Sequence, residues 1–360
     1  MRNDRIRKIH IGFLCLFLCA LMTLLPGCGM DLSGTKVVLT TGLNKDEVFR
    51  IETISCSRPE MMVYLTNIQN QYENVYGTEI WATEADGTTL EERVKDNALA
   101  KMAQVKTMNL MAQTLGIELT ADESKSVENA ADIYYDSLSR PEIDGMGIDR
   151  DTIASLYREY LIARKVYEHI IADVNPEISD DEARNITVEY ILIKTYTTDA
   201  TGRRVEMSSD EARELFVRAE EAHDRAVAGE SFDSLVAEYS DSDEMIKSLG
   251  KEDLDNNYLR TALFDLANGE ISEVLTTEDG YLVALCLSTY NLEETDLNKI
   301  EIVERERETI FGEQYDAYVQ NLTRKLNDQL WSEIEFLHGD DITTSDFFTV
   351  ADDNLILSEQ

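Results

Sequence analysis

Apolar side chains recur at helical spacing through much of the first half of the chain. Between Met61 and Val75 they alternate at intervals of four and three residues, which places them on one face of a helix. Ser57 and Glu60 form a capping box before this run, and Gly77 marks its end. Similar start and stop signals predict three further helices, over residues 88–115, 120–141 and 151–173.

The pattern changes to alternation near Ile186. Residues 187–194 are rich in β-branched side chains and alternate in polarity, which predicts a strand. Helices are predicted over residues 208–228, 232–239 and 258–267, with a polar loop at 240–257 between the last two. A hairpin turn at 278–280 then precedes a strand over 281–290. The order β-α-α-α-β-β predicts a domain of the α+β class over residues 179–290.

Helical spacing returns over residues 291–336, with an apolar stripe that this segment cannot bury alone. We therefore expect it to pack on the helices before Val174 and to complete a mainly helical domain that begins near residue 43. The α+β domain would then be an insertion in the helical one. Residues 47–56 predict a strand, and residues 337–360, which contain five aspartates, predict a solvated and mobile acidic tail.

The first residues have the order of a secretory signal peptide. Four basic residues lie among the first eight, and residues 11–25 are apolar and uncharged. The run from Leu25 to Cys28 resembles the bacterial lipobox, whose Cys receives a lipid. We therefore expect a signal peptide over residues 1–27, a lipid on Cys28 that holds the chain on the outer face of the cell membrane, and a tether over 28–42. An ordinary signal peptide that happens to contain a Cys is the alternative.

A large excess of acidic residues argues against nucleic acid as a partner. The chain has 71 acidic and 33 basic residues, a net charge of −38, so nucleic acid is not an expected partner. Cys56 and Cys286 are assigned to different elements, and a disulfide between them is the less favoured alternative. His169, His223 and His338 are solitary and predict surface or packing roles. No Cys or His pair has the spacing of metal ligands, so we expect no metal and no cofactor.

Four short stretches between Ile186 and Tyr290 together resemble the parvulin family of peptidyl-prolyl isomerases. The resemblance covers roughly a third of the chain and implies isomerisation of X-Pro peptide bonds. The stretches are Tyr190 to Ile193, Ala228 to Ser240 with its Gly-Glu-Ser-Phe, Phe264 to Ser272 with its Gly-Glu-Ile-Ser, and Thr277 to Tyr281.

The flanking helices resemble the N-terminal chaperone domain of extracytoplasmic foldases of the SurA and PrsA type. The residues that carry this resemblance are Leu115 to Glu123 and Ile178 to Glu182. The fold implied is a mainly helical, SurA-N-like chaperone domain with an inserted parvulin-like domain. The partners implied are unfolded or extended polypeptides. The oligomeric state stays open, and an envelope with one membrane is preferred to one with two.

The parvulin resemblance also assigns positions to a site. The family holds two His and a Cys or Asp beside an apolar wall, and a bond rotation needs no cofactor. By position, the two His are Tyr190 and Leu282 here, and the Cys or Asp is Ser242. Tyr190 and Ser242 can still form a hydrogen bond, whereas Leu282 cannot. The apolar wall that would seat the substrate consists of Leu249, Leu259 and Phe264, together with Leu282; ordinary core packing is an equal alternative for Leu249 and Phe264.

Two functions follow from this comparison. The first is a foldase in which a chaperone lobe carries an isomerase with a degenerate site. The second is a non-catalytic chaperone whose parvulin-like domain is structural or binds extended peptide. A solute-binding lipoprotein is a third class, but the sequence lacks the two-lobed α/β pattern that such a protein needs.

Overall fold

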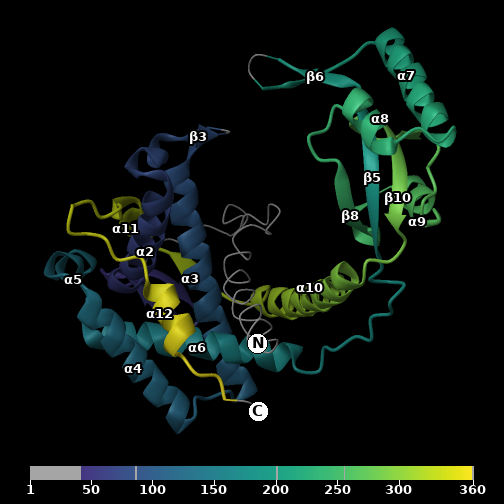
Figure 1. Ribbon diagram of the computed structural model, residues 1–360. Helices are drawn as coiled ribbons and strands as arrows, with labels where there is room; N and C mark the ends of the chain where they lie inside the picture. Colours follow the sequence, from purple (N-terminus) through teal and green to yellow (C-terminus); the bar gives the residue numbers. More distant parts are fainter. Residues whose placement is uncertain (1–41, 86, 200–201, 255, 359–360) are drawn as a thin grey trace. The chain divides into compact units, whose positions relative to one another are not determined.

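A computed structural model of the chain describes residues 42–85, 87–199, 202–254 and 256–358. These residues form two compact units, divided between Ala172 and Asp173 and again between Ile310 and Phe311. We call residues 173–310 the sheet unit and the remainder the helical unit (Figure 1). The predicted signal peptide, the lipid site Cys28 and the tether up to residue 41 lie outside the described residues. No helix within the described ranges has the length and apolarity needed to cross a membrane.

The helical unit is built around α2 (Arg58–Tyr76), whose residues from Met61 to Asn70 are all buried. Around it lie α3 (Leu90–Leu115), α4 (Ala121–Ser137), α5 (Arg140–Met146) and α6 (Arg150–Ile171). Capping boxes fix several starts, as in α4, where the Thr120 N–H donates to the Glu123 carboxylate at 2.8 Å. The helix predicted over residues 120–141 ends earlier, at Ser137, and Pro141 lies in the first turn of α5, where its missing N–H costs no hydrogen bond.

Several elements at the edges of the helical unit differ from the prediction. The single strand expected over residues 47–56 is a hairpin of β1 (Glu47–Ile51) and β2 (Ile54–Ser57), with Glu52 in a positive-φ conformation at the turn. The helix expected over 291–336 ends at Val319, as α10 (Leu292–Val319), and only its residues from Phe311 onward belong to the helical unit that the whole segment was expected to complete. The chain then forms β11 (Arg324–Leu326), which pairs with β1, and the short α11 (Asp328–Glu333). Two small elements complete the unit, a 3-10 helix at Thr78–Ala82 and a two-residue hairpin of β3 (Glu84–Ala85) and β4 (Thr88–Thr89).

The expectation of a mobile acidic tail is wrong. Residues 347–354 form the helix α12 (Phe347–Asn354), and several of its side chains lie in the core of the helical unit. Phe347 and Ala351 are fully buried, and Phe348, Val350 and Leu355 nearly so. The aspartates of this segment lie among apolar residues that share one helical face, and burial of that face outweighs the solubility of the aspartates.

The sheet unit has an antiparallel sheet with strand order β8-β5-β10-β9. Its long central strands are β5 (Asn185–Lys194) and β10 (Gly280–Ser288), flanked by β8 (Ile246–Gly250) and β9 (Leu275–Thr276). β8 lies within the predicted loop 240–257, so that part of the prediction is wrong. The hairpin β6 (Tyr196–Thr198) and β7 (Arg204–Glu206) was not predicted either. The α+β class and the insertion of this unit into the helical one are confirmed.

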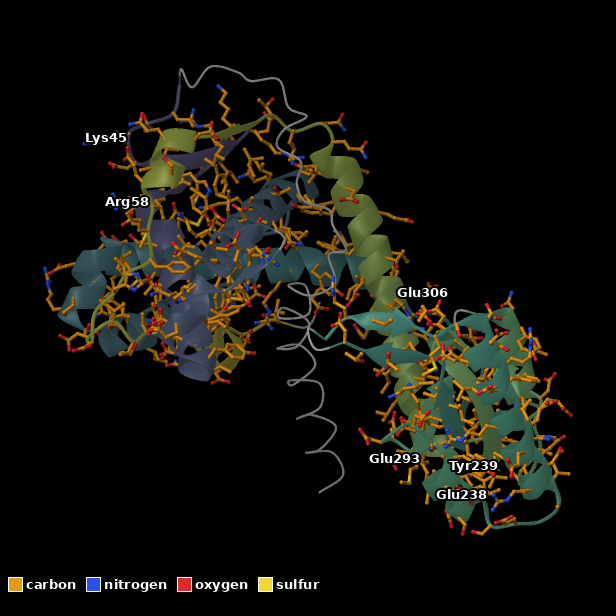
Figure 2. The ribbon with its side chains drawn as sticks, turned by 90° about the horizontal axis from the view of Figure 1, so that it is seen from above. Lys45, Arg58, Glu238, Tyr239, Glu293 and Glu306 are labelled. Carbon is orange, nitrogen blue, oxygen red and sulfur yellow. The ribbon has the colours of Figure 1, made fainter. Side chains whose placement is uncertain are left out.

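Helices cover both faces of this sheet (Figure 1). One face packs on α7 (Ser209–Val227) and α8 (Phe232–Tyr239), and the other on α9 (Asn257–Phe264). The Arg225 guanidinium joins α7 to α8, because it donates to the hydroxyl of Tyr239 at 2.8 Å and to the carboxylate of Glu238 at 3.0 Å. Figure 2 labels both of these acceptors on the sheet unit. The two faces of the sheet have separate apolar cores, one shared with α7 and α8 and the other with α9.

Candidate functional site

The predicted site residues meet on the face of the sheet that packs on α9. Tyr190 of β5, Leu249 of β8 and Phe264 of α9 are buried in one apolar cluster, and Leu259 and Leu282 pack against it half-buried. Alternation along the strands explains this placement, since successive side chains point to opposite faces. Ile191 and Val283 accordingly belong to the core on the other face.

The register of the strands brings Tyr190 and Leu282 close together, the two positions at which the sequence resemblance expects the family's His. Tyr190 pairs with Ala284, and Leu282 pairs with Leu192. Tyr190 and Leu282 are therefore diagonal neighbours on adjacent strands, within reach of long side chains. Gly280 allows this register, because a Cβ there would lie 2.1 Å from the Ile193 carbonyl oxygen. The glycine of the predicted hairpin is thus required by a close approach of the two strands.

The polar groups of the site come from β5 and the loop after α8. The Tyr190 hydroxyl lies 3.2 Å from the Ser242 Oγ, as the sequence predicted was possible. The same hydroxyl lies 3.5 Å from Glu244 Oε2, a neighbour that sequence reasoning missed. The Glu244 N–H donates to Ser242 Oγ at 3.2 Å, so a short turn sets the direction of Glu244. No spacing signal reveals such a residue, because its position depends on the turn rather than on a strand or helix.

The buried part of the site is mostly apolar, and the polar groups at its edge are Tyr190, Ser242 and Glu244. Leu282 presents only carbon to this cluster. Cys286 lies in the same cluster and is fully buried, and burial raises the pKa of its thiol, so it stays protonated. The surface can seat an apolar ring between half-buried Leu259 and Leu282 and offer it the hydroxyls of Tyr190 and Ser242.

The carboxyl with the most strongly raised pKa in the sheet unit lies away from this site. Glu189 is on β5, one residue before Tyr190, and therefore faces the opposite side of the sheet. Burial and the neighbouring carboxyl of Asp233 raise the pKa of Glu189 to about 7. Across the described ranges, no group of three or more His, Cys, Asp or Glu side chains is arranged to hold a metal ion.

The sheet unit belongs to a known class of domain. Residues 191–287 match the family model Rotamase, described as a PPIC-type PPIASE domain. This range runs from the middle of β5 to near the end of β10 and includes the site residues Ser242, Leu249, Leu259, Phe264 and Leu282, and it begins one residue after Tyr190. The chain therefore carries a peptidyl-prolyl isomerase domain of the parvulin type, as its motifs predicted.

Several solved structures are similar over most of the chain. PrsA from Bacillus cereus is 16% identical, with 75% of this chain and 97% of that one covered and a TM-score of 0.31. PrsA from Bacillus subtilis is 18% identical, with 74% and 96% covered and a TM-score of 0.24. A third structure, of the SurA-like chaperones PEB4 and Cj1289 from Campylobacter jejuni, is 13% identical, with 78% and 98% covered and a TM-score of 0.28. Comparison with the curated proteins gives no match.

Proposed function

We propose that this protein is an extracytoplasmic folding factor that binds unfolded polypeptide, and that its parvulin-type domain isomerises X-Pro bonds only weakly. The observation that carries the proposal is the family match of residues 191–287, and it is supported by an apolar cluster on one face of the sheet, where the sequence resemblance expects the family's site. Such an apolar surface is the chemistry needed to seat a proline ring. The net charge of −38 keeps a protein with exposed apolar binding surface soluble and favours basic clients.

Attachment to a membrane is part of this proposal. The basic start, the apolar stretch over residues 11–25 and the lipobox-like run that ends at Cys28 support export and lipidation. A lipid on Cys28 and the tether after it would hold the folding factor at the outer face of the cell membrane. That position suits a protein that meets its clients as they emerge unfolded from the membrane.

Low isomerase activity follows from the residues at the floor of the site. Rotation about a peptide bond faces a barrier of ~18–20 kcal/mol, and a catalyst must favour the twisted amide over the planar one. Tyr190 and Ser242 can donate hydrogen bonds at this floor, but Leu282 removes one polar partner from it. The same observation supports a second candidate, a chaperone whose parvulin-type domain binds polypeptide without any catalysis.

Isomerisation of a short X-Pro peptide separates the two candidates. We expect the wild-type chain to accelerate the reaction weakly over its uncatalysed time of tens to hundreds of seconds. The Tyr190→His, Leu282→His double variant should be faster, whereas Leu287→His, at an exposed position of the same strand, should match the wild type. Turnover by the wild type that already equals that of the double variant would sink the low-activity proposal. No acceleration by the wild type would favour the non-catalytic candidate.

A further inference from the structure

Residues 337–358, here called the C-terminal segment, cover a surface formed by α2, α4, α5 and α6, here called the groove, and they are held there by buried side chains and by hydrogen bonds to their main chain. Side-chain amides of α2 form one side of the groove. Asn70 and Gln71 donate to the carbonyl oxygens of residues 344 and 345, at 2.8 and 2.9 Å. Asn67 accepts from the Phe347 N–H at 3.0 Å. Three side-chain amides of one helix thus form hydrogen bonds with main-chain groups of residues 344, 345 and 347.

Helices α4, α5 and α6 form the other side of this groove. The Glu142 carboxylate accepts from the N–H groups of residues 343 and 344, at 2.8 and 2.7 Å. The Tyr157 hydroxyl donates to the Phe347 carbonyl oxygen at 2.9 Å. Near the end of the segment, Ser126 and Glu123 accept from the N–H groups of residues 356 and 358, at 3.2 and 3.1 Å. These bonds are made to groups that every polypeptide has, proline N–H excepted, so they impose little side-chain specificity.

An aromatic pocket supplies the side-chain contacts of the segment. The Phe347 ring is fully buried, stacks on Tyr157 with centroids 4.5 Å apart, and meets Tyr134 edge-on at 5.3 Å. The Phe348 ring meets Tyr64 edge-on at 5.1 Å. Figure 1 shows the segment in yellow, with α12 beside α4, and the stacking of Phe347 on Tyr157 joins α12 to α6. Two adjacent aromatic rings are therefore the feature of the occupant that this pocket selects.

We propose that this groove is a polypeptide-binding site of the helical unit, and that the C-terminal segment is its built-in occupant, which a client segment with two adjacent aromatic residues displaces. The inference rests on the proposed function as a binder of unfolded polypeptide and names where and what it binds. Recognition through the main chain suits a protein with many clients. The aromatic pair then sets which part of a client is held.

Competition with the tethered segment makes the groove selective. A segment joined to its site by a short chain acts at an effective concentration of roughly millimolar, so weak ligands do not enter. The segment carries five aspartates in a chain of net charge −38, and like charges weaken its hold. A neutral or basic client segment meets less repulsion. The preferred client is therefore an exposed aromatic pair in a neutral or basic stretch, which is typical of unfolded chains.

Cutting the chain beside the segment tests the groove. A specific protease site inserted between the exposed residues His338 and Gly339 allows the folded protein to be cut while the segment stays bound. We expect the cut chain to exchange it for a fluorescent peptide of residues 339–360, seen as a saturable rise in anisotropy. A peptide with Phe347→Ser and Phe348→Ser should bind at least about tenfold more weakly. Equal binding of the two peptides, or no uptake by a cut chain that keeps its helical circular dichroism, would overturn the proposal.

Hydrogen exchange on the uncut chain provides a test that needs no variant. Reduced, alkylated lysozyme serves as the unfolded client, and its binding is followed separately by anisotropy. We expect amides of residues 343–356 to exchange at least about tenfold faster when this client is bound, because they lose their partners in the groove. Client binding with unchanged protection at 343–356 would refute the groove and leave the folding-factor proposal intact. Absence of client binding would refute the folding factor, while the cut-chain result would still decide on the groove.

Discussion

Replacing Phe347 by Ala should strongly destabilise the helical unit. The Phe347 side chain is fully buried and contacts the rings of Tyr157, Tyr134 and Tyr64 as well as that of Phe348. Truncation of a buried Phe costs about 3–5 kcal/mol of unfolding free energy. Aromatic pairs add about 0.5–1.5 kcal/mol each beyond area burial, so we expect a loss near the upper end, about 4–5 kcal/mol.

Urea unfolding followed by tryptophan fluorescence measures this loss in one unit alone. The chain has two tryptophans, Trp81 and Trp331, and both lie in the helical unit. With a slope of about 2 kcal/mol per molar urea, the midpoint for Phe347→Ala should fall by about 2 M. Thr349→Ala, at an exposed position of the same helix, is the matched control and should stay within about 0.5 kcal/mol of wild type. An equally small change for Phe347→Ala would refute the burial of α12 in the core.

Three further predictions concern charge and attachment. Burial and the neighbouring Asp233 raise the pKa of Glu189 to about 7, so its contribution to stability is complete below pH ~4.5 and is lost as the pH rises through 7. Glu189→Gln should remove this pH dependence from the unfolding transition of the sheet unit, measured by calorimetry. An unchanged pH profile in the variant would contradict the assignment. Burial opposes ionisation of Glu123, but its hydrogen bonds to Lys165 and to backbone N–H groups lower its pKa to about 2, so about 3 kcal/mol should be present above pH ~4.5 and be lost as the pH falls towards 2. Tryptophan fluorescence reads that loss, and stability that does not fall between pH 4.5 and 2 would argue against it. Cys28→Ser should move the protein from the membrane fraction of the producing cells to the soluble fraction, and continued sedimentation with membranes would exclude the lipid anchor.

Local signals explain why most helices of the helical unit could be predicted. Ser57 with Glu60, Thr89 with Glu92, and Thr120 with Glu123 each fix a helix start through bonds between residues three apart. Such bonds need no information from the rest of the chain. Alternation over the ten residues of β5 is similarly local and long enough to be read.

The elements that were missed depend on partners distant in sequence. β8 has five residues, two of them Lys247 and Ser248, and becomes a strand only by pairing with β5. β11 is a strand because it pairs with β1, more than 270 residues away. Phe347 and Phe348 stand among aspartates, and only a complete aromatic pocket shows that they are buried.

The candidate site was predictable as far as its strands and motifs extend. The family motifs assigned Tyr190, Ser242 and Leu282, and the structure places the hydroxyls of the first two 3.2 Å apart. Glu244 was missed because it belongs to a loop whose turn is set by Ser242. Strand periodicity predicts which side a residue faces, but it does not predict the path of a loop.

Refolding of a client whose slow phase is an X-Pro isomerisation tests the central claim most directly. The client is diluted from denaturant, at a concentration where it aggregates, with and without an equimolar amount of this protein. We predict a higher yield of native client, with the rate constant of the slow phase changed by less than about threefold, because the protein binds unfolded polypeptide and isomerises weakly. An unchanged yield, or a slow phase accelerated many-fold by a substoichiometric amount of the protein, would contradict the account.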